Sequence, residues 1–246
     1  MGAMEELNGR RILFTSGKGG VGKSTLAAAF AKILAAEGHS VLLIDFDVSL
    51  RTLDIMLGLG DLVLYDWYDV IAERCDPFSA IVTRGRGPEL LPAPLEPHNL
   101  TNFQIENLVK NYEDYYDYII LDSPAGVGRG FAAALCPADL AFLVSTPDRV
   151  CVRSAGVAAE KLQQRGIESR LLINRFVKKS VENGRSLNID EVIDSTGIQL
   201  LGVIPEDPSL VQSAQTGGPI DLRRKGSRAI LRVLGRMDGE EIPLKF

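Results

Sequence analysis

The sequence contains no run of about 18 uncharged apolar residues, so no transmembrane helix is expected. It also lacks the basic-then-apolar start that is typical of a secretory signal. Cysteine is scarce: Cys75, Cys136 and Cys151 are far apart and odd in number, which excludes a disulfide framework and a paired-cysteine metal or cluster site. These absences predict a soluble cytoplasmic protein with reduced, buried thiols.

Positive charge is not in excess either. The chain has 27 Lys and Arg against 32 Asp and Glu, a formal net charge of −5, so a generally basic surface that coats nucleic acid is not expected. Close to half of the 246 residues are apolar (46%), which is enough for a substantial core. No repeat or linker is visible. The sequence therefore predicts one domain over residues 1–246, with a flexible N-terminus (1–9) and a short C-terminal tail (239–246).

Short apolar runs recur along the chain, and none alternates apolar with polar residues. Each is expected to be a strand covered on both faces, as in a parallel sheet. The expected strands are 11–15, 41–45, 118–122, 140–145, 170–174 and 200–204, with one further short strand within 84–99. The expected helices are 23–37, 101–112, 127–135, 151–165, 188–195 and 225–237. The alternation predicts an α/β fold: a doubly wound, mostly parallel sheet with helices on both faces.

The segment TSGKGGVGKSTLAAAF (15–30) has the spacing of a phosphate-binding loop, from Gly17 through Gly22 to Lys23 and Ser24. A strand precedes it and a helix follows, which disfavours a coincidental glycine-rich turn. Glycines let the backbone N–H groups point at phosphate oxygens, and the helix N-terminus adds partial positive charge. Lys23 is expected to reach the β- and γ-phosphates, and the Ser24 hydroxyl to bind Mg²⁺. In the helix, Lys32 is expected on the outer face.

Aspartates follow two of the expected strands: Asp45 and Asp47 after one, and Asp122 after another. Ligands of open α/β sheets lie at the carboxyl ends of the strands, so these side chains are expected beside the loop. Asp122 fits the carboxylate that holds magnesium, through a water molecule. An aspartate that only caps a turn is the alternative.

The run KGGVGKST (18–25) resembles the deviant Walker A motif of the MinD/ParA group of P-loop ATPases. The resemblance narrows to its MinD subfamily, whose sequences the segments 45–71, 122–126, 174–176 and 202–220 follow in order. It implies an Mg-dependent ATPase switch that hydrolyses ATP to ADP and phosphate, forms a homodimer with ATP and acts in septum site placement. Lys18 would reach across that dimer to the phosphates of the other subunit, as an arginine finger supplied in trans does.

The resemblance also implies individual roles. Lys18, Lys23 and Asp47 would be catalytic, with Asp47 orienting the attacking water, and Ser24, Asp45 and Asp122 would surround the metal. The nucleotide-binding residues would be Gly17, Lys18, Gly19, Gly20, Val21, Gly22, Lys23, Ser24, Thr25, Asn174, Arg175, Pro205, Glu206 and Asp207. Asn174 would recognise adenine, although an asparagine at a strand end is as often a turn former.

Several features depart from the MinD pattern. Thr52 stands in place of an asparagine, Gly128 in place of a glutamate, and segment 152–156 lacks the expected aspartates. In the family these regions couple nucleotide state to dimerisation and to the partners MinC and MinE, so a MinC/MinE-like or another regulatory partner is left open. The family's C-terminal membrane helix has no counterpart before Phe246, so membrane binding is not expected; a peripheral location on the inner face of the membrane is the alternative.

Residues 225–237 have a basic stripe (Lys225, Arg228, Arg232 and Arg236) opposite apolar residues. The favoured interpretation is a core helix with a solvated basic face, and the alternative is a lipid contact. A ParA-like DNA partition protein and a nucleotide-binding switch with little turnover are the other functions considered. An iron–sulfur carrier is disfavoured because the paired cysteines it needs are absent.

Overall fold

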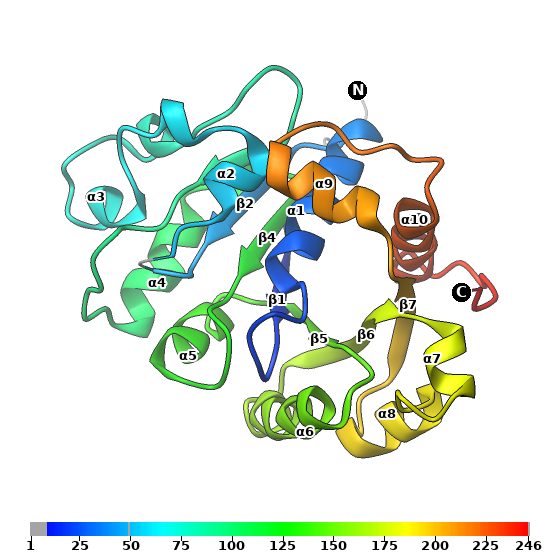
Figure 1. The fold of residues 1–246 in the computed structure, drawn as a ribbon. Helices are drawn as coiled ribbons and strands as arrows, with labels where there is room; N and C mark the ends of the chain where they lie inside the picture. Colours follow the sequence, from blue (N-terminus) through cyan, green and yellow to red (C-terminus); the bar gives the residue numbers. More distant parts are fainter. Residues whose placement is uncertain (1–8, 49, 246) are drawn as a thin grey trace, which may run out of the picture.

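The computed structural model describes residues 9–48 and 50–245, so the expected flexible N-terminus lies outside the described residues except for Gly9. Seven parallel strands form one sheet in the order β3-β2-β4-β1-β5-β6-β7 (Figure 1). The strands are β1 (Arg10–Thr15), β2 (Val41–Asp45), β3 (Glu89–Leu91), β4 (Tyr118–Asp122), β5 (Leu140–Ser145), β6 (Glu168–Phe176) and β7 (Leu200–Pro205). The predicted parallel α/β sheet is confirmed.

Helices cover both faces of this sheet (Figure 1). One layer contains α1 (Lys23–Ala36), α2 (Leu53–Leu57), α9 (Pro208–Thr216) and α10 (Lys225–Met237). The other contains α3 (Trp67–Ile71), α4 (Asn102–Lys110), α5 (Arg129–Leu135), α6 (Arg149–Gln164), α7 (Lys178–Glu182) and α8 (Ile189–Thr196). Short 3₁₀ turns are η1 (Gly60–Leu62), η2 (Pro77–Ala80) and η3 (Glu113–Tyr115).

The two cores explain why the strands are apolar without alternation. In β1, Ile12 and Phe14 pack into the cluster beneath α1, α2, α9 and α10, whereas Leu13 packs into the cluster on the opposite face. Each residue of a central strand therefore contacts one helical layer or the other, and both layers require apolar side chains.

The register of the sheet brings three strand ends together. Asp45 at the end of β2 pairs with Asp122 at the end of β4, and Asp122 also pairs with Phe14 of β1. The carboxyl ends of β1, β2 and β4 are thus neighbours, and the loop after β1 leaves the sheet at the same edge.

Helix α10 is a core helix, as the sequence analysis favoured. Ile230 is fully buried in it, and the basic stripe is partly engaged. Arg236 donates hydrogen bonds to the backbone carbonyl groups of Ile242 and Pro243 and to that of Leu201, at 2.8, 2.9 and 2.9 Å. The stripe thus holds the C-terminal segment against the sheet.

Lys32 of α1 corrects one expectation. It does not project outward from the molecule but is half-buried, with its ammonium group between α2 and α9. Helical periodicity predicted that Lys32 lies on the side of α1 that faces away from the sheet, and the structure agrees on that point. Periodicity could not show that two other helices cover that side of α1.

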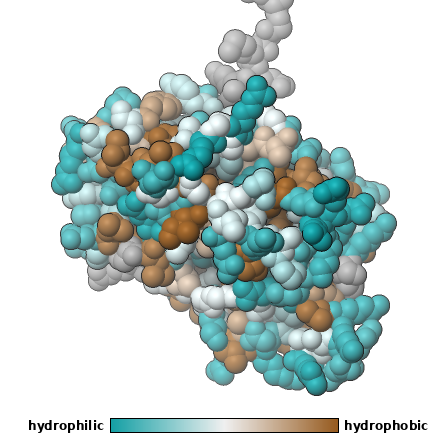
Figure 2. All heavy atoms as spheres, turned by 45° about the horizontal axis from the view of Figure 1, so that its top comes forward, coloured by the Kyte–Doolittle hydropathy of each residue, from teal (hydrophilic) through white to brown (hydrophobic). Residues whose placement is uncertain are grey.

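Within residues 9–48 and 50–245, no helix is long and apolar enough to cross a membrane. On the face that Figure 2 shows, hydrophilic side chains dominate and apolar ones form several separate patches.

Candidate functional site

The loop between β1 and α1 is packed tightly against its neighbours. A Cβ atom on Gly17 would lie 1.9 Å from the backbone oxygen of Ser154 in α6. Gly22, the N-cap of α1, has a φ of 87°, and a Cβ atom there would lie 2.5 Å from Nδ2 of Asn174. Glycine is therefore required at both positions, by a close approach and by a left-handed backbone.

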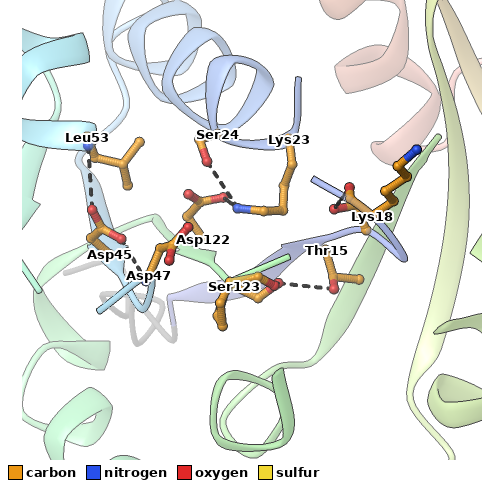
Figure 3. Close-up of polar contacts among 11 residues, drawn as sticks. Thr15, Lys18, Lys23, Ser24, Asp45, Asp47, Leu53, Asp122 and Ser123 are labelled. Atoms are coloured by element: carbon orange, nitrogen blue, oxygen red, sulfur yellow. Dashed lines mark hydrogen bonds and ion pairs between the residues drawn. The ribbon is translucent and has the colours of Figure 1, made fainter. Parts of the chain in front are cut away.

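Lys23, at the start of α1, forms a buried ion pair across the strand ends. Its Nζ lies 2.6 Å from Oδ1 of Asp122 and donates a hydrogen bond to Oγ of Ser24 at 3.0 Å (Figure 3). Asp122 is fully buried and Lys23 is 6% exposed. The second carboxylate oxygen of Asp122, Oδ2, is buried and has no hydrogen-bond partner within residues 9–48 and 50–245.

Asp45 is also fully buried and is held by backbone and side-chain donors. Its carboxylate accepts hydrogen bonds from the N–H groups of Asp47 and Leu53, at 2.8 and 3.5 Å (Figure 3). Its backbone oxygen accepts one from the indole N–H of Trp67 at 2.8 Å. Burial and the nearby charge of Asp122 raise the pKa of Asp45 to about 8. The carboxyl group is therefore suited to a site where a cation arrives with the ligand.

Asp47 lies beside this cluster and is half-buried. Burial raises the pKa of its carboxyl group, and the positive charge of Lys23 partly opposes that rise. Asp47 thus has the access to solvent that Asp45 and Asp122 lack.

Lys18 is the one predicted catalytic residue that the fold does not bring to the cluster. It is exposed, and Figure 3 shows its ammonium group pointing away from Lys23 and Asp122. Its backbone oxygen accepts a hydrogen bond from Oγ of Ser16 at 3.0 Å, which fixes the loop and not the side chain. The neighbouring Gly19 and Gly20 are exposed as well.

Val21 closes the loop and is buried in the core. Its backbone oxygen accepts a hydrogen bond at 2.8 Å from Nδ2 of Asn174, which is at the carboxyl end of β6. Arg175 follows with an exposed side chain and a φ of 54°. The loop and the end of β6 are thus joined directly. Thr25 is half-buried in the first turn of α1.

Residues 205–207, which the resemblance assigns to nucleotide binding, are called the base loop here and join β7 to α9. The N–H of Glu206 donates to the backbone oxygen of Phe176 at 3.0 Å, which places this loop beside the end of β6. The Asp207 carboxylate is used elsewhere, because it caps α9 through Ser209 and accepts the N–H of Gly226 at 2.7 Å. Burial opposes ionisation of Asp207, but these hydrogen bonds outweigh it and lower its pKa. Its observed role is structural.

The donor set fits a magnesium ion. Carboxylate and hydroxyl oxygens are the ligands that this hard cation prefers, either directly or through water. Ser24, Asp45 and Asp122 supply them, and Oδ2 of Asp122 is a buried acceptor to which no described residue donates a hydrogen bond. No sequence signal showed that the indole of Trp67 would hold the backbone of Asp45.

The CobQ/CobB/MinD/ParA nucleotide binding domain family matches residues 12–220. The septum site-determining protein MinD of Bacillus subtilis (strain 168) is 37% identical over 246 aligned positions, which cover 96% of this chain and 92% of that protein. MinD in the MinC:MinD cell division complex of Aquifex aeolicus superimposes with a TM-score of 0.88 at 38% identity, over 96% of this chain and 98% of the other. MinD of Pyrococcus horikoshii OT3 complexed with Mg-ADP gives 0.80 at 26% identity, over 93% and 96%.

Proposed function

The chain belongs to the CobQ/CobB/MinD/ParA nucleotide-binding family, and we propose that it is an ATPase that acts, as MinD does, in the placement of the division septum. One observation carries the proposal beyond similarity. The phosphate-binding loop, the buried Lys23–Asp122 pair and Asp45 with Asp47 converge at the neighbouring ends of β1, β4 and β2. This is the side-chain set that phosphoryl transfer to water requires.

Lys23 has to change partners when a nucleotide binds. In the free chain its ammonium group is held by Asp122 and Ser24. On reaching the β- and γ-phosphates it releases both, and they become available to the metal. Ser24, Asp45 and Asp122 would hold Mg²⁺, which neutralises charge on the phosphates when it is bound. Asp47, the half-buried carboxylate of the group, orients the attacking water.

Lys18 acts on a second copy of the chain. Its side chain is exposed and directed away from the Lys23–Asp122 pair of its own subunit (Figure 3), and its charge acts on Asp148. A phosphate-binding role for Lys18 therefore requires a neighbouring subunit. A cation placed on the charge that develops between the β- and γ-phosphates lowers the barrier to hydrolysis. ATP therefore brings two subunits together in a homodimer, and turnover depends on that dimer.

The base binds between the ends of β6 and β7. Asn174 is fixed by its hydrogen bond to Val21, and among the described residues none donates a hydrogen bond to its Oδ1. That oxygen is left to accept a hydrogen bond from the adenine amino group. Arg175, Pro205 and Glu206 border the same region. Asp207 contributes by anchoring the loop through its capping contacts.

A regulatory partner similar to MinC reads the dimer, a proposal that rests on the Aquifex aeolicus complex. The differences at Thr52, Gly128 and 152–156 lie in segments that could alter this recognition or favour a MinE-like partner. We place the protein in the cytoplasm, where any contact with the inner face of the membrane is peripheral. DNA partition is less well supported, because Arg236 of the basic stripe is engaged by carbonyl groups of the C-terminal segment.

Size-exclusion chromatography with light scattering tests this function. Wild type and Asp47→Ala are each compared with Mg-ADP and Mg-ATP, and phosphate release is followed in parallel. The wild type should hydrolyse ATP, and Asp47→Ala should remain a dimer with ATP. Lys18→Ala should bind ADP normally but neither dimerise nor turn over, whereas Lys110→Ala, an exposed lysine of α4, should resemble wild type. Full turnover by Lys18→Ala, or an Asp47→Ala protein that stays monomeric with ATP, would contradict the assignment.

A further inference from the structure

The ammonium group of Lys32 is surrounded by oxygen atoms from two other helices. Its Nζ donates to the backbone oxygen of Met56 in α2 at 2.9 Å and to that of Gly218, after α9, at 2.7 Å. It also contacts Oγ and the backbone oxygen of Ser213 in α9, at 3.0 and 3.3 Å. Among the described residues no carboxylate forms an ion pair with it.

A half-buried lysine without a carboxylate needs another source of stabilisation. Burial lowers the pKa of Lys32 to about 8, so this position is unfavourable for its charge. The acceptors that compensate are carbonyl groups in or just after the last turns of α2 and α9. The negative ends of both helix dipoles lie there. The Gly218 oxygen also accepts a hydrogen bond from Oγ of Ser213 in α9, at 2.8 Å. Lys32 thus satisfies two helix ends at once.

The same two helix ends are in backbone contact. Gly58 and Gly217 are their C-caps, both in the left-handed conformation with φ of 68° and 66°. A Cβ atom on Gly217 would lie 2.5 Å from Cα of Gly58. Lys32, on the third helix, holds this junction from the side of α1. Three helices therefore meet at one point.

The opposite ends of these helices are at the candidate site. Helix α1 begins at Lys23, in the phosphate-binding loop. Helix α2 begins at Leu53, whose N–H donates to the carboxylate of Asp45. Helix α9 begins directly after Asp207, in the proposed base loop. Each of the three helices therefore connects the candidate site to the junction at Lys32.

We propose that Lys32 is a positioning residue for ATP hydrolysis, which links α9 on the base side of the site to α2 and hence to the carboxylate of Asp45. The proposal rests on the ATPase function proposed above. Binding of the base fixes the start of α9, and the Lys32 junction transfers that order to α2. Phosphate binding by the loop itself does not require the link.

The test compares the rate of ATP hydrolysis and the affinity for Mg-ADP in Lys32→Met. This substitution keeps nearly the length of the side chain and removes its charge and its hydrogen-bond donors. The rate at saturating ATP should fall about tenfold, since about 1.4 kcal/mol of lost alignment changes a rate by that factor. The affinity for Mg-ADP should change less than threefold. Lys110→Met should match wild type in both.

The single tryptophan supplies a second readout. The indole of Trp67 donates to the backbone oxygen of Asp45, so its fluorescence reports on that segment. Saturating Mg-ADP should change the fluorescence of wild type and change that of Lys32→Met by less than half as much. Circular dichroism measures the folded fraction of each variant. A variant that is only less stable should give the full fluorescence change per folded molecule at saturating Mg-ADP.

Lys32→Arg provides the rescue. A cavity of about 320 Å³, lined by Lys32, Leu57 and Gly218, gives a longer cationic side chain room, so most of the rate and of the fluorescence response should return. If Lys32→Met does not fold, Lys32→Gln should show the same split with a two- to fivefold loss of rate. Turnover within twofold of wild type in a folded Lys32→Met or Lys32→Gln protein overturns the positioning role. A wild type that binds ADP but does not hydrolyse ATP refutes the proposed function instead.

Discussion

Replacing Lys23 by methionine should destabilise the protein even when no nucleotide is present. The change removes the ammonium group that lies 2.6 Å from the fully buried carboxylate of Asp122. Among the described residues, that ammonium group is the only partner of this carboxylate. Breaking a buried ion pair by removing one member costs about 3–5 kcal/mol, because the remaining charge is left without compensation. For a domain of this size each kcal/mol lowers the melting temperature by roughly 2–4 °C. Lys23→Met should therefore melt roughly 6–20 °C below wild type.

The measurements are thermal melting and urea denaturation of nucleotide-free, metal-free protein, both followed by circular dichroism. Lys18→Met is the matched control, since this exposed lysine of the same loop should change the free energy of unfolding by no more than about 0.5 kcal/mol. The double variant Lys23→Met/Asp122→Asn should recover most of the loss, because no buried charge remains in it. A Lys23→Met protein as stable as the Lys18→Met control would show that the ion pair does not support the free fold.

Two further substitutions test the packing and the electrostatics of the site. Gly217→Ala should lower the free energy of unfolding by about 2 kcal/mol or more, because its Cβ meets the backbone of Gly58, whereas Gly85→Ala has a similar φ but open space and should cost about 1 kcal/mol in urea denaturation. Asp45→Asn should remove a pH dependence. In the folded protein the Asp45 carboxyl group keeps its proton up to about pH 8, whereas in the unfolded chain it loses the proton near its ordinary pKa of 3.8. Its contribution to the free energy of unfolding is therefore complete below pH 3.8 and is lost as the pH rises through 8. Wild type should lose stability relative to Asp45→Asn between pH 5 and 8, by at most about 1.4 kcal/mol per pH unit, and a constant difference in urea denaturation over that range would refute the assignment.

The sheet could be predicted from the sequence because its strands are buried on both faces. Continuous apolar runs at 41–45, 118–122 and 140–145 coincide with β2, β4 and β5. Their helical covers were predicted to within a few residues for the same reason, since each must present an apolar stripe to the sheet. Strand order was not predicted, because it depends on how the connections between strands cross the sheet and not on the sequence of any single segment.

Short helices escaped prediction. Helix α2 (Leu53–Leu57) is too short to show a helical period, and residues 208–216, which form α9, were not assigned to any helix. A start signal for α9 was nevertheless present: Asp207 is followed by Pro208, the order of an N-cap and a first helical residue. Because these two helices went unrecognised, nothing in the sequence could show that Lys32 would lie between them.

The residue types of the site were predictable, but their partners in the free chain were not. Local spacing predicts a phosphate-binding lysine and an aspartate at a strand end, whereas the contact of Lys23 with Asp122 depends on the β1–β4 register. The same limit applies to Asp45, which Trp67 holds from 22 residues away along the chain.

The Lys23–Asp122 pair also constrains how a nucleotide can enter. An approaching phosphate competes with Asp122 for the ammonium group of Lys23. If the phosphate takes that group, neither carboxylate oxygen of the buried Asp122 keeps a partner among the described residues. Such a charge is costly inside a protein, and the nearby phosphates would add repulsion. Asp45 adds to this cost only where it is ionised, above about pH 8, since it is a second fully buried carboxyl group at the same strand ends. Under the proposed function, we therefore expect the site to favour a nucleotide that arrives with its own divalent cation, because only that nucleotide offers Asp122 a replacement for Lys23.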